Sequence, residues 1–366
     1  MNHGWEKKRL GDVCQINFGK RIVAKDTPPG PYYVYGGGGA TFTTMDYNRE
    51  NCMIVSRFAM SPECVRFVRG RFFLNDSGLS VQSNNGLLTQ EFVEKYLWAI
   101  QPQIYNLGRG AAQKNLNTKS FSEMPIPIPA VEVQRQIVSE LDKINEMLEV
   151  KRGQLKDLDM LSQSLFYEMF GEPIENPQGW DMKQIQEFAK TTAGGTPSKS
   201  HPEYYNGGKI PWLRSGEVCK MNISNTELCI TDLGMQNSSA KLVPVNSVVV
   251  AMYGATAAQV GVIRSEMTLN QAISAIFPNS HTKPIFLYFC LSGLKESLLK
   301  VAHGAAQPNI SQAIIKSTKI ILPPIELQNE FSVRVEAIEE QKRVIESTIS
   351  DLEVLLASRM DYWFND

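Results

Sequence analysis

The stretches GAAQKNL at residues 110–116 and GAAQPNI at residues 304–310 decide how this chain is organised, because they are near copies that lie 194 residues apart. At the same offset, Pro129 falls on Pro323 and Gln134 falls on Gln328. Internal repeats of this length indicate a duplicated structural unit. The sequence therefore predicts one unit, a globular part followed by a helix, that occurs twice.

A long heptad pattern closes each copy. Residues 130–170 and 324–366 carry apolar side chains at alternating spacings of four and three over five heptads. Such a pattern predicts two long helices that pack as a coiled coil, each about 60 Å long at 1.5 Å per residue. The alternative is that each helix covers only its own globular part. The predicted seam residues are Ile137, Leu141, Ile144, Leu148, Leu155, Leu158, Phe331, Val335, Ile338, Ile345, Ile349 and Leu352.

The linker FGEPIENPQGW at 170–180 is rich in Pro, Gly and Asn and separates the two copies. If the helices pack antiparallel, the globular parts are related by a pseudo-two-fold axis. The predicted fold class is α+β: two pseudo-symmetric globular domains of mixed α/β structure, separated by a pair of long antiparallel coiled-coil helices. We expect globular domains at 1–129 and 171–323, and helices at 130–170 and 324–366.

Composition narrows the class of protein. The 366 residues are 43% hydrophobic and 20% charged, which is typical of a soluble globular protein. The sequence contains neither the apolar core of a signal peptide nor an apolar run near the roughly 20 residues of a membrane helix. The six cysteines form no C-x-x-C pair and the four histidines have no metal-ligand spacing. We therefore expect buried thiols, a cytoplasmic location and no metal site.

Charge is segregated along the chain although the net charge is only −1. Residues 1–129 carry 15 Lys and Arg against 10 Asp and Glu, and residues 171–323 carry 13 against 10. The helical segments carry 5 against 8 and 4 against 10. Basic globular parts favour a polyanionic partner, and acidic helices favour a protein partner. Ordinary variation in surface charge is the alternative.

Two regions carry the candidate contacts to DNA. SRFAMSPECVRFVRGRFF at 56–73 interleaves arginines with aromatic residues, and AGGTPSKSHPEYYNGGKIPWLRSGEVCK at 193–220 places cations on loops. Such cations hold phosphates and read guanine edges, although a half-exposed pair of strands has the same alternation. The expected DNA-contacting residues are Lys20, Arg57, Arg66, Arg69, Arg71 and Gln113 in the first copy, and Lys199, Lys209, Arg214, Lys220 and Gln307 in the second.

The repeated GAAQ string itself predicts a structural junction. Its small residues fit a close backbone approach where the globular part meets the long helix. Contact of the Gln113 and Gln307 amides with a DNA backbone is the alternative.

Several catalytic motifs are missing from the sequence. No G-x-x-x-x-G-K-[ST] or G-x-S-x-G occurs, and YGGGGA at 35–40 fails G-x-G-x-x-G. NPQG at 176–179 lacks the second proline and the aromatic residue of an amino-methyltransferase motif. These absences favour a recognition protein without catalytic residues of its own.

The chain resembles the specificity subunit of type I restriction–modification systems. The resemblance rests on W-x-x-x-x-[LI] at 5–10 and 180–185, GGTPS at 194–198, IPWLRSGEV at 210–218, the GA-x-Q-x-N-[LI] strings and the central FGEPIENPQGW. It implies two target recognition domains in a bacterial DNA-binding subunit, each reading one half of a bipartite, asymmetric site in double-stranded DNA. It also implies helices that set the spacing and dock two methyltransferase subunits, with restriction/translocase subunits joining the complex.

The same resemblance implies a non-catalytic subunit without a cofactor. S-adenosylmethionine, ATP and Mg would act on the partner subunits, where adenine methylation and DNA cleavage take place. The first copy departs from the pattern, since NFGKRIVAKDTPPG at 17–30 and YYVYGGGGA at 32–40 stand where GGTPS and PWLRSGEV are expected. Residues that read bases therefore cannot be transferred between the copies.

Two other classes of protein remain as alternatives. One is a two-headed coiled-coil scaffold that binds proteins rather than DNA. The other is a self-contained DNA methyltransferase or nuclease with degenerate motifs.

Overall fold

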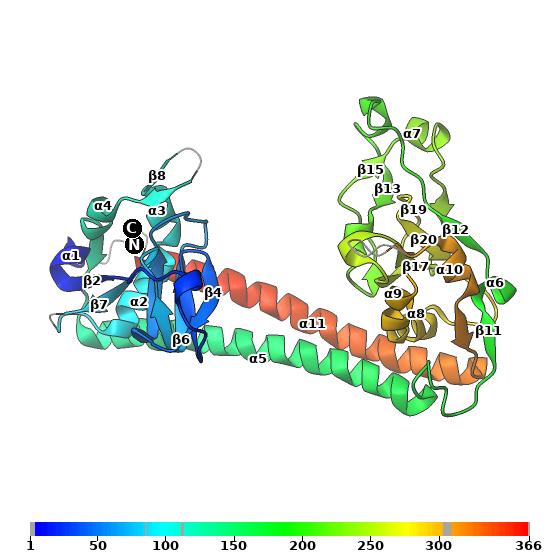
Figure 1. The fold of residues 1–366 in the computed structure, drawn as a ribbon, viewed down its shortest axis with the longest axis horizontal. Coiled ribbons are helices and arrows are strands. Elements are labelled where there is room, and N and C mark those ends of the chain that lie inside the picture. The colour runs from blue at the N-terminus through cyan, green and yellow to red at the C-terminus, as the bar shows by residue number, and fades with distance from the viewer. Residues whose placement is uncertain (1–3, 85, 111–112, 303–308, 365–366) are drawn as a thin grey trace. The chain divides into compact units, whose positions relative to one another are not determined.

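The structure, a computed structural model, describes residues 4–84, 86–110, 113–302 and 309–364 (Figure 1). The chain forms two compact units. Unit 1 comprises Met1–Gly153 and Glu346–Asp366, and unit 2 comprises Gln154–Ile345. Each unit thus combines one globular part with portions of both long helices. The division into four domains at 129, 170 and 323 stays a prediction.

Unit 1 is built on a mixed six-stranded sheet with the order β2-β7-β5-β6-β3-β4. Its main core lies between one face of this sheet and the helices, where Val55, Leu79 and Phe92 are fully buried. The elements are β1 Lys7–Arg9, α1 Leu10–Val13, β2 Cys14–Phe18, η1 Ala24–Asp26, β3 Tyr32–Gly36, β4 Gly39–Thr44, β5 Arg49–Ser56, β6 Val65–Leu74, β7 Gly78–Ser83, α2 Gln90–Ala99, α3 Gln101–Asn106, β8 Gly108–Arg109, β9 Asn115–Leu116, α4 Thr118–Ser122 and β10 Pro125–Pro127.

Unit 2 contains a five-stranded sheet with the order β12-β20-β17-β18-β14 and a smaller sheet with the order β15-β13-β19-β16. The strands of the larger sheet are short, and its three central strands β17, β18 and β20 are mostly apolar and buried at every position. The elements are β11 Met182–Gln184, α6 Ile185–Phe188, β12 Thr191–Ala193, η2 Pro202–Tyr204, β13 Ile210–Leu213, η3 Ser215–Glu217, β14 Asn222–Ile223, β15 Cys229–Ile230, α7 Asp232–Gln236, β16 Leu242–Val243, β17 Val248–Ala251, η4 Gly254–Thr256, β18 Val260–Ile263, β19 Met267–Leu269, β20 Ile273–Ile276, α8 Pro284–Gly293, α9 Lys295–Lys300, α10 Gln312–Ser317 and β21 Lys319–Ile321.

Each unit has its own core sheet, and the two sheets have the same topology. This confirms the predicted α+β duplication. The order β2-β7-β5-β6-β3 in unit 1 returns as β12-β20-β17-β18-β14 in unit 2. In both, the last pair is parallel and the other pairs are antiparallel. Val55 pairs with Val65, and Val250 pairs with Val260. Register and strand direction are therefore conserved between the copies at an offset of 195 residues.

A small strand pair closes each globular part just before its long helix. In unit 1, β1 pairs antiparallel with β10, and in unit 2, β11 pairs antiparallel with β21. A strand from the start of each copy is thus hydrogen-bonded to the strand that precedes the long helix. This arrangement fixes where the helix leaves the globular part.

A buried glutamine ties each long helix to its globular part. Gln134 Nε2 donates to the Pro129 carbonyl at 2.9 Å, and its Oε1 accepts from the backbone N–H of Thr89, the N-cap of α2, at 2.8 Å. Gln328 Nε2 donates to the Pro323 carbonyl at 2.9 Å, and its Oε1 accepts from the N–H of Lys283, the N-cap of α8, at 2.9 Å. Both glutamines are 0% exposed. Sequence-matched residues therefore perform the same structural task in both units.

The long helices are α5 Val131–Phe170 and α11 Ile325–Phe364. In unit 1, Glu140 of α5 pairs with Arg359 of α11, and Arg152 pairs with Glu353 at 2.7 Å. The partner number falls as the α5 number rises, so the helices pack antiparallel there.

Unit 2 repeats this antiparallel packing. Asp159 of α5 pairs with Lys342 of α11 at 2.6 Å, and the Phe166 and Phe331 rings lie 5.6 Å apart. The expected pairing of the two helices is present within each unit.

All twelve seam residues are buried or half-buried. Four of them, Ile137 to Leu148 at heptad spacing, belong to the main core of unit 1, and Phe331 and Val335 belong to the core of unit 2. The helices therefore pair with one another and also cover their own globular parts, so the two interpretations of the heptad pattern hold together.

Burial of the cysteines varies along the chain. Cys14, Cys64 and Cys290 are buried, and burial raises the pKa of the Cys290 thiol to about 12. Cys219 is exposed, so the expectation of buried thiols is wrong for that residue. Among the described residues, no helix has the length and apolar character needed to cross a membrane.

Candidate nucleic-acid interface

A polar groove of about 960 Å³ lies across strands β2, β7 and β5 of unit 1. Amide and hydroxyl side chains line it because polar residues alternate with core residues along β2 and β7. Such side chains donate to phosphates and pair with base edges. The polar lining residues are Gln15, Asn17, Lys20, Asn48, Arg49, Glu50, Asn51, Ser80, Gln82, Ser83 and Gln90.

Lys20 lines this groove, and Arg57 lies over the ring of Phe18, which also lines it. Lys20 is exposed, and its ammonium group has no ion-pair partner among the residues that the structure describes. The Arg57 guanidinium lies over the rings of Phe18 at 5.0 Å and Phe58 at 4.6 Å, and it donates to the Asp76 carbonyl at 3.3 Å. Aromatic contacts hold the guanidinium plane in place without neutralising its charge. These two predicted residues are suited to contact with an anion.

Arg71 is partly neutralised by Glu50, which lines the groove. It pairs with Glu50 at 3.3 Å and lies over the Tyr47 ring at 4.7 Å. Its pKa is raised by its hydrogen bonds, first to Tyr32 and then to Glu50. Because Glu50 itself lines the groove, Arg71 shares the same surface as Lys20 and Arg57.

Arg49 is a groove residue that the sequence did not reveal. Its guanidinium donates to Ser80 Oγ at 2.8 Å and to the carbonyls of Asn48, Asn17 and Phe18 at 2.8–3.3 Å. All these partners are uncharged, so the groove floor keeps a half-buried positive charge. The alternation of arginine and aromatic residues in 56–73 gave no signal for it, because Arg49 precedes that stretch.

A β-bulge separates Arg69 from Arg71. The register of β5 against β6 shifts between Glu50 and Cys52, and Gly70 adopts φ +74° while its N–H donates to Asn51 Oδ1 at 2.7 Å. A positive φ of this kind suits glycine, which has no Cβ to clash. The bulge separates Arg71, which pairs with Glu50, from Arg69, which pairs with Glu149 of α5.

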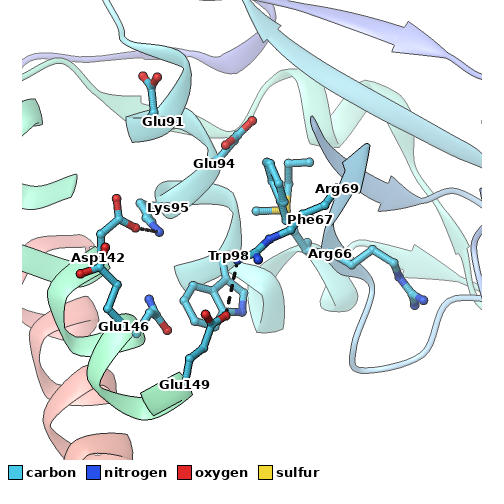
Figure 2. A pocket seen from close by; sticks show the side chains of 13 residues that line it. Arg66, Phe67, Arg69, Glu91, Glu94, Lys95, Trp98, Asp142, Glu146 and Glu149 are labelled. Atoms are coloured by element: carbon cyan, nitrogen blue, oxygen red, sulfur yellow. Dashed lines mark hydrogen bonds and ion pairs between the residues drawn. The ribbon is translucent and has the colours of Figure 1, made fainter. Parts of the chain in front are cut away.

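Arg66 and Arg69 therefore belong to a different surface. Arg69 pairs with Glu149 at 3.4 Å, and Arg66 donates to the carbonyls of Gly37 at 3.3 Å and Glu63 at 3.2 Å. Both residues border a pocket between β6, α2 and α5 whose rim is acidic (Figure 2). The structure thus divides the five predicted cations of this part between a polar groove and an acidic pocket.

The repeated string packs against the end of a central strand in each unit. Asn115 Oδ1 accepts from the Ala59 N–H at 3.2 Å, just after β5, and Asn309 forms a bridge with Tyr253, just after β17. Asn115 and Asn309 therefore contact the globular part itself. The expected junction rests on small residues of which Ala111, Ala112 and residues 304–306 lie outside the described residues, so it stays a prediction. Gln113 is exposed in this loop, and Gln307 lies outside the described residues.

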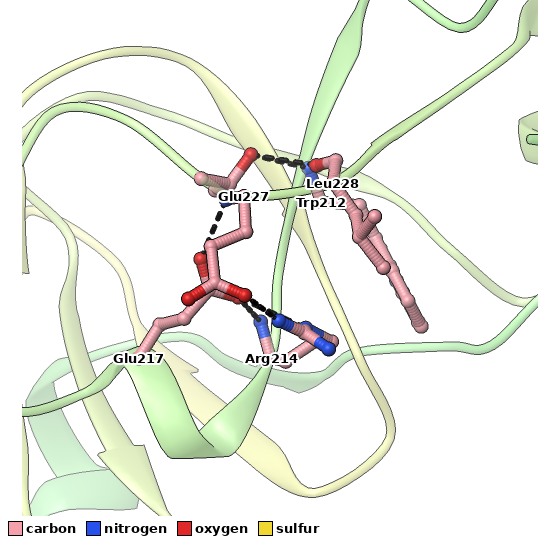
Figure 3. Close-up of polar contacts among 6 residues, drawn as sticks. Trp212, Arg214, Glu217, Glu227 and Leu228 are labelled. Carbon is pink, nitrogen blue, oxygen red and sulfur yellow. Dashed lines mark hydrogen bonds and ion pairs between the residues drawn. The ribbon is translucent and has the colours of Figure 1, made fainter. Parts of the chain in front are cut away.

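The four predicted cations of unit 2 are not joined by any hydrogen bond. Lys199, Lys209 and Lys220 are exposed on separate loops. Arg214 Nε donates to Glu217 Oε2 at 3.2 Å, and its other terminus pairs with Glu227 (Figure 3). Two carboxylates therefore neutralise Arg214 before any ligand binds.

The described residues contain no group of three or more His, Cys, Asp or Glu side chains that could hold a metal ion. The DNA contacts expected of individual residues all remain predictions. Neither the fold nor the similarity to other proteins tests them residue by residue.

Comparison with known proteins identifies the duplicated architecture. The family model of the type I restriction modification DNA specificity domain matches residues 2–159 and again residues 177–353. The EcoR124I/EcoR124II specificity subunit of Escherichia coli is 26% identical over 239 residues, which are 63% of this chain and 56% of that protein. The MjaIX specificity subunit of Methanocaldococcus jannaschii is 21% identical over 92% of this chain and 87% of its own length.

Solved structures show the same fold. The type I restriction–modification S subunit from M. genitalium aligns with a TM-score of 0.61 at 17% identity, covering 99% of this chain and 96% of that one. A structure that describes complex assembly and conformational transition of a type I R-M system aligns with a TM-score of 0.59 at 18% identity, covering 98% and 97%.

Proposed function

This chain belongs to the type I restriction–modification DNA specificity family, and we propose that it supplies the DNA sequence recognition of such a system. In this proposal, the globular part of each unit reads one half of a bipartite, asymmetric site in double-stranded DNA. Helices α5 and α11 set the spacing between the halves and dock two methyltransferase subunits. Restriction/translocase subunits join the same complex.

The repeated core sheet is the observation that carries the proposal. Both units place the same five strands in the same order, yet their exposed side chains differ. For example, Arg66 of β6 corresponds in register to Gly261 of β18. One scaffold with two different surfaces suits the reading of two different half-sites.

We assign no catalytic step to this chain. Methylation of adenine and cleavage of DNA would take place on the partner subunits, which would bring S-adenosylmethionine, ATP and Mg. The work of this chain is binding: cations such as Lys20 would contact phosphates, and side chains in the groove of unit 1 would meet base edges. We place the complex in the cytoplasm, where its DNA substrate lies. Neither a protein-binding scaffold nor a self-contained enzyme is supported by the family match.

Sequencing of methylated DNA tests the proposal. A host carrying the partner methyltransferase is examined with and without this gene. We expect a bipartite motif, two short specified blocks around an unspecified spacer, to be methylated only when the gene is present. Methylation that does not depend on the gene, or S-adenosylmethionine binding by the purified chain alone, would contradict the proposal.

A further inference from the structure

A pocket of about 600 Å³ in unit 1 lies between strand β6, helix α2 and the first part of α5 (Figure 2). Its apolar lining is Met53, Val65, Phe67 and Trp98, and the Phe67 side chain stays 44% exposed. The pocket thus combines apolar side chains with carboxylates. The carboxylates that line the pocket are Glu91, Glu94, Asp142, Glu146 and Glu149.

Few of these carboxylates are neutralised within unit 1. Lys95 pairs with Asp142, and Arg69 pairs with Glu149 at 3.4 Å, where the two side chains are 80% and 66% exposed. Figure 2 shows that Arg66 points away from the carboxylates, toward the backbone groups that it binds. Glu91 and Glu146 have no ion-pair partner among the described residues. The pocket therefore carries surplus negative charge.

Glu94 is a carboxylate of this pocket whose charged form is disfavoured by burial. It is half-buried, and its partner Gln90 donates to it at 3.0 Å without neutralising it. Burial raises the pKa of its carboxyl group above the ordinary value. A cation placed beside this carboxylate would favour its charged form and so offset the penalty of burial.

The matching region of unit 2 holds its charged side chains differently. Register matching places Arg264 on the position of Arg69, and the helix offset places Glu339 on the position of Asn145. Arg264 Nε donates to Asn222 Oδ1 at 2.6 Å, and Asn222 Nδ2 donates to Glu339 Oε2 at 3.0 Å. The charge of Arg264 also faces Glu336.

A second cation of unit 2, Lys342, pairs with carboxylates of both long helices. Lys342, on the position of Leu148, donates to Glu339 Oε1 at 2.7 Å and pairs with Asp159 at 2.6 Å. Phe289 and Ser292 replace Lys95 and Trp98 on the facing helix. In unit 2, Lys342 neutralises Glu339, whereas in unit 1 the matched Leu148 is buried in the core and supplies no charge. The described residues of unit 1 likewise offer no ion-pair partner to Glu91 and Glu146.

We propose that the acidic pocket of unit 1 receives a lysine- or arginine-bearing segment of a methyltransferase subunit. The identity of that partner rests on the proposed function. The aliphatic stem of the incoming side chain would lie against Phe67 and Trp98, and its charged head would reach Glu91 and Glu146. DNA is a poor occupant, because its phosphates would meet the same carboxylates.

The test measures the affinity of the full-length chain for its methyltransferase subunit over a series of salt concentrations. The variant combines E91K with E146K, so that the chain supplies the missing cations itself. The control is E123K, which changes the charge by two units at an exposed site outside the pocket. We expect the double variant to bind at least about tenfold more weakly with a flatter salt dependence, and the control to stay within about twofold of the unmodified chain.

The conservative pair E91Q and E146Q separates charge from misfolding. We expect it to weaken binding by about threefold or more while the melting temperature stays unchanged. Unchanged affinity in both double variants would overturn the proposal, and so would loss of self-association without loss of partner binding, which would identify a second copy as the occupant. If the unmodified chain binds no methyltransferase subunit at all, the proposed function itself fails, a result distinct from either of these.

Discussion

Strand β6 with helix α5 in unit 1, and strand β18 with helix α11 in unit 2, occupy matching places but carry different charges. In unit 2, Arg264 and Lys342 are held by amide and carboxylate partners between strand and helix. In unit 1, Arg69 makes one exposed ion pair, and carboxylates border an open pocket. The backbone register is the same in both. The framework is therefore set by buried positions, and the charged surface is free to diverge.

The buried glutamines give the largest expected effect and test whether the framework is shared. Q134A and Q328A each remove three hydrogen bonds from a fully buried site and leave backbone groups unpaired. We expect each variant to lower the free energy of unfolding by about 3 kcal/mol. Denaturant unfolding measures this, with Q136A and Q341A as exposed controls on the same helices. A large effect in only one unit would break the equivalence.

Substitutions of Arg57 and Lys20, next to the groove of unit 1, should affect DNA binding in different ways. R57A should cost about 2 kcal/mol at one position of one half-site, because the stacked guanidinium is held ready to meet a base edge. K20A should weaken binding to every sequence and lower the salt slope by about one. Binding of the assembled complex to a panel of single-base variants distinguishes the two. An R57A effect in both half-sites would contradict the assignment of one half-site to each unit.

Arg264 of unit 2 and Arg69 of unit 1 occupy matching positions but should differ in their contribution to stability. R264A should destabilise unit 2 by about 1.5 kcal/mol, since it leaves a half-buried acceptor on Asn222 and removes a second hydrogen bond to the exposed Asn246. R69A should change the stability of unit 1 by less than about 0.5 kcal/mol, because its ion pair is exposed. Thermal unfolding of the two variants side by side provides the measurement. Equal effects would show that the two sites are energetically alike.

The sequence predicted much of the framework. The heptad pattern predicted helices at 130–170 and 324–366, and the structure has helices at Val131–Phe170 and Ile325–Phe364. The prediction succeeds because heptad spacing marks the buried face of a helix within a short stretch of sequence. The repeat matched Gln134 with Gln328, although no sequence signal showed that they are buried or which groups they bind.

The sites were less accessible to sequence analysis, because their partners come from distant parts of the chain. Arg49 is held by carbonyls of residues about thirty positions earlier, and Arg214 is neutralised by Glu227, which lies beyond the motif that contains it. Arg66 and Arg69 are close neighbours in sequence, yet they have different partners, a loop carbonyl and the long helix. The one-residue bulge at Gly70 likewise separates Arg69 from Arg71, and periodicity cannot show it.

The smallest expected effect is a pH dependence in the helix pair of unit 1. Hydrogen bonds from Arg359, and secondarily from Trp363, lower the pKa of Glu140 below its ordinary value. A lowered folded-state pKa contributes stability above the unfolded pKa, and that stability is lost as the pH falls through the folded value. E140Q should therefore cost about 0.5 kcal/mol at neutral pH and nothing in strong acid. Unfolding free energies measured from pH 7 to pH 3 check this, and a constant difference would rule out the ion pair as its cause.

The central claim is that two units on one framework read two half-sites. The most direct test exchanges residues 1–129 for the matching segment of a related specificity subunit and sequences the methylated DNA of the host. We expect one half of the bipartite motif to change while the other half and the spacer length stay the same. A change in both halves, or in neither, would contradict it.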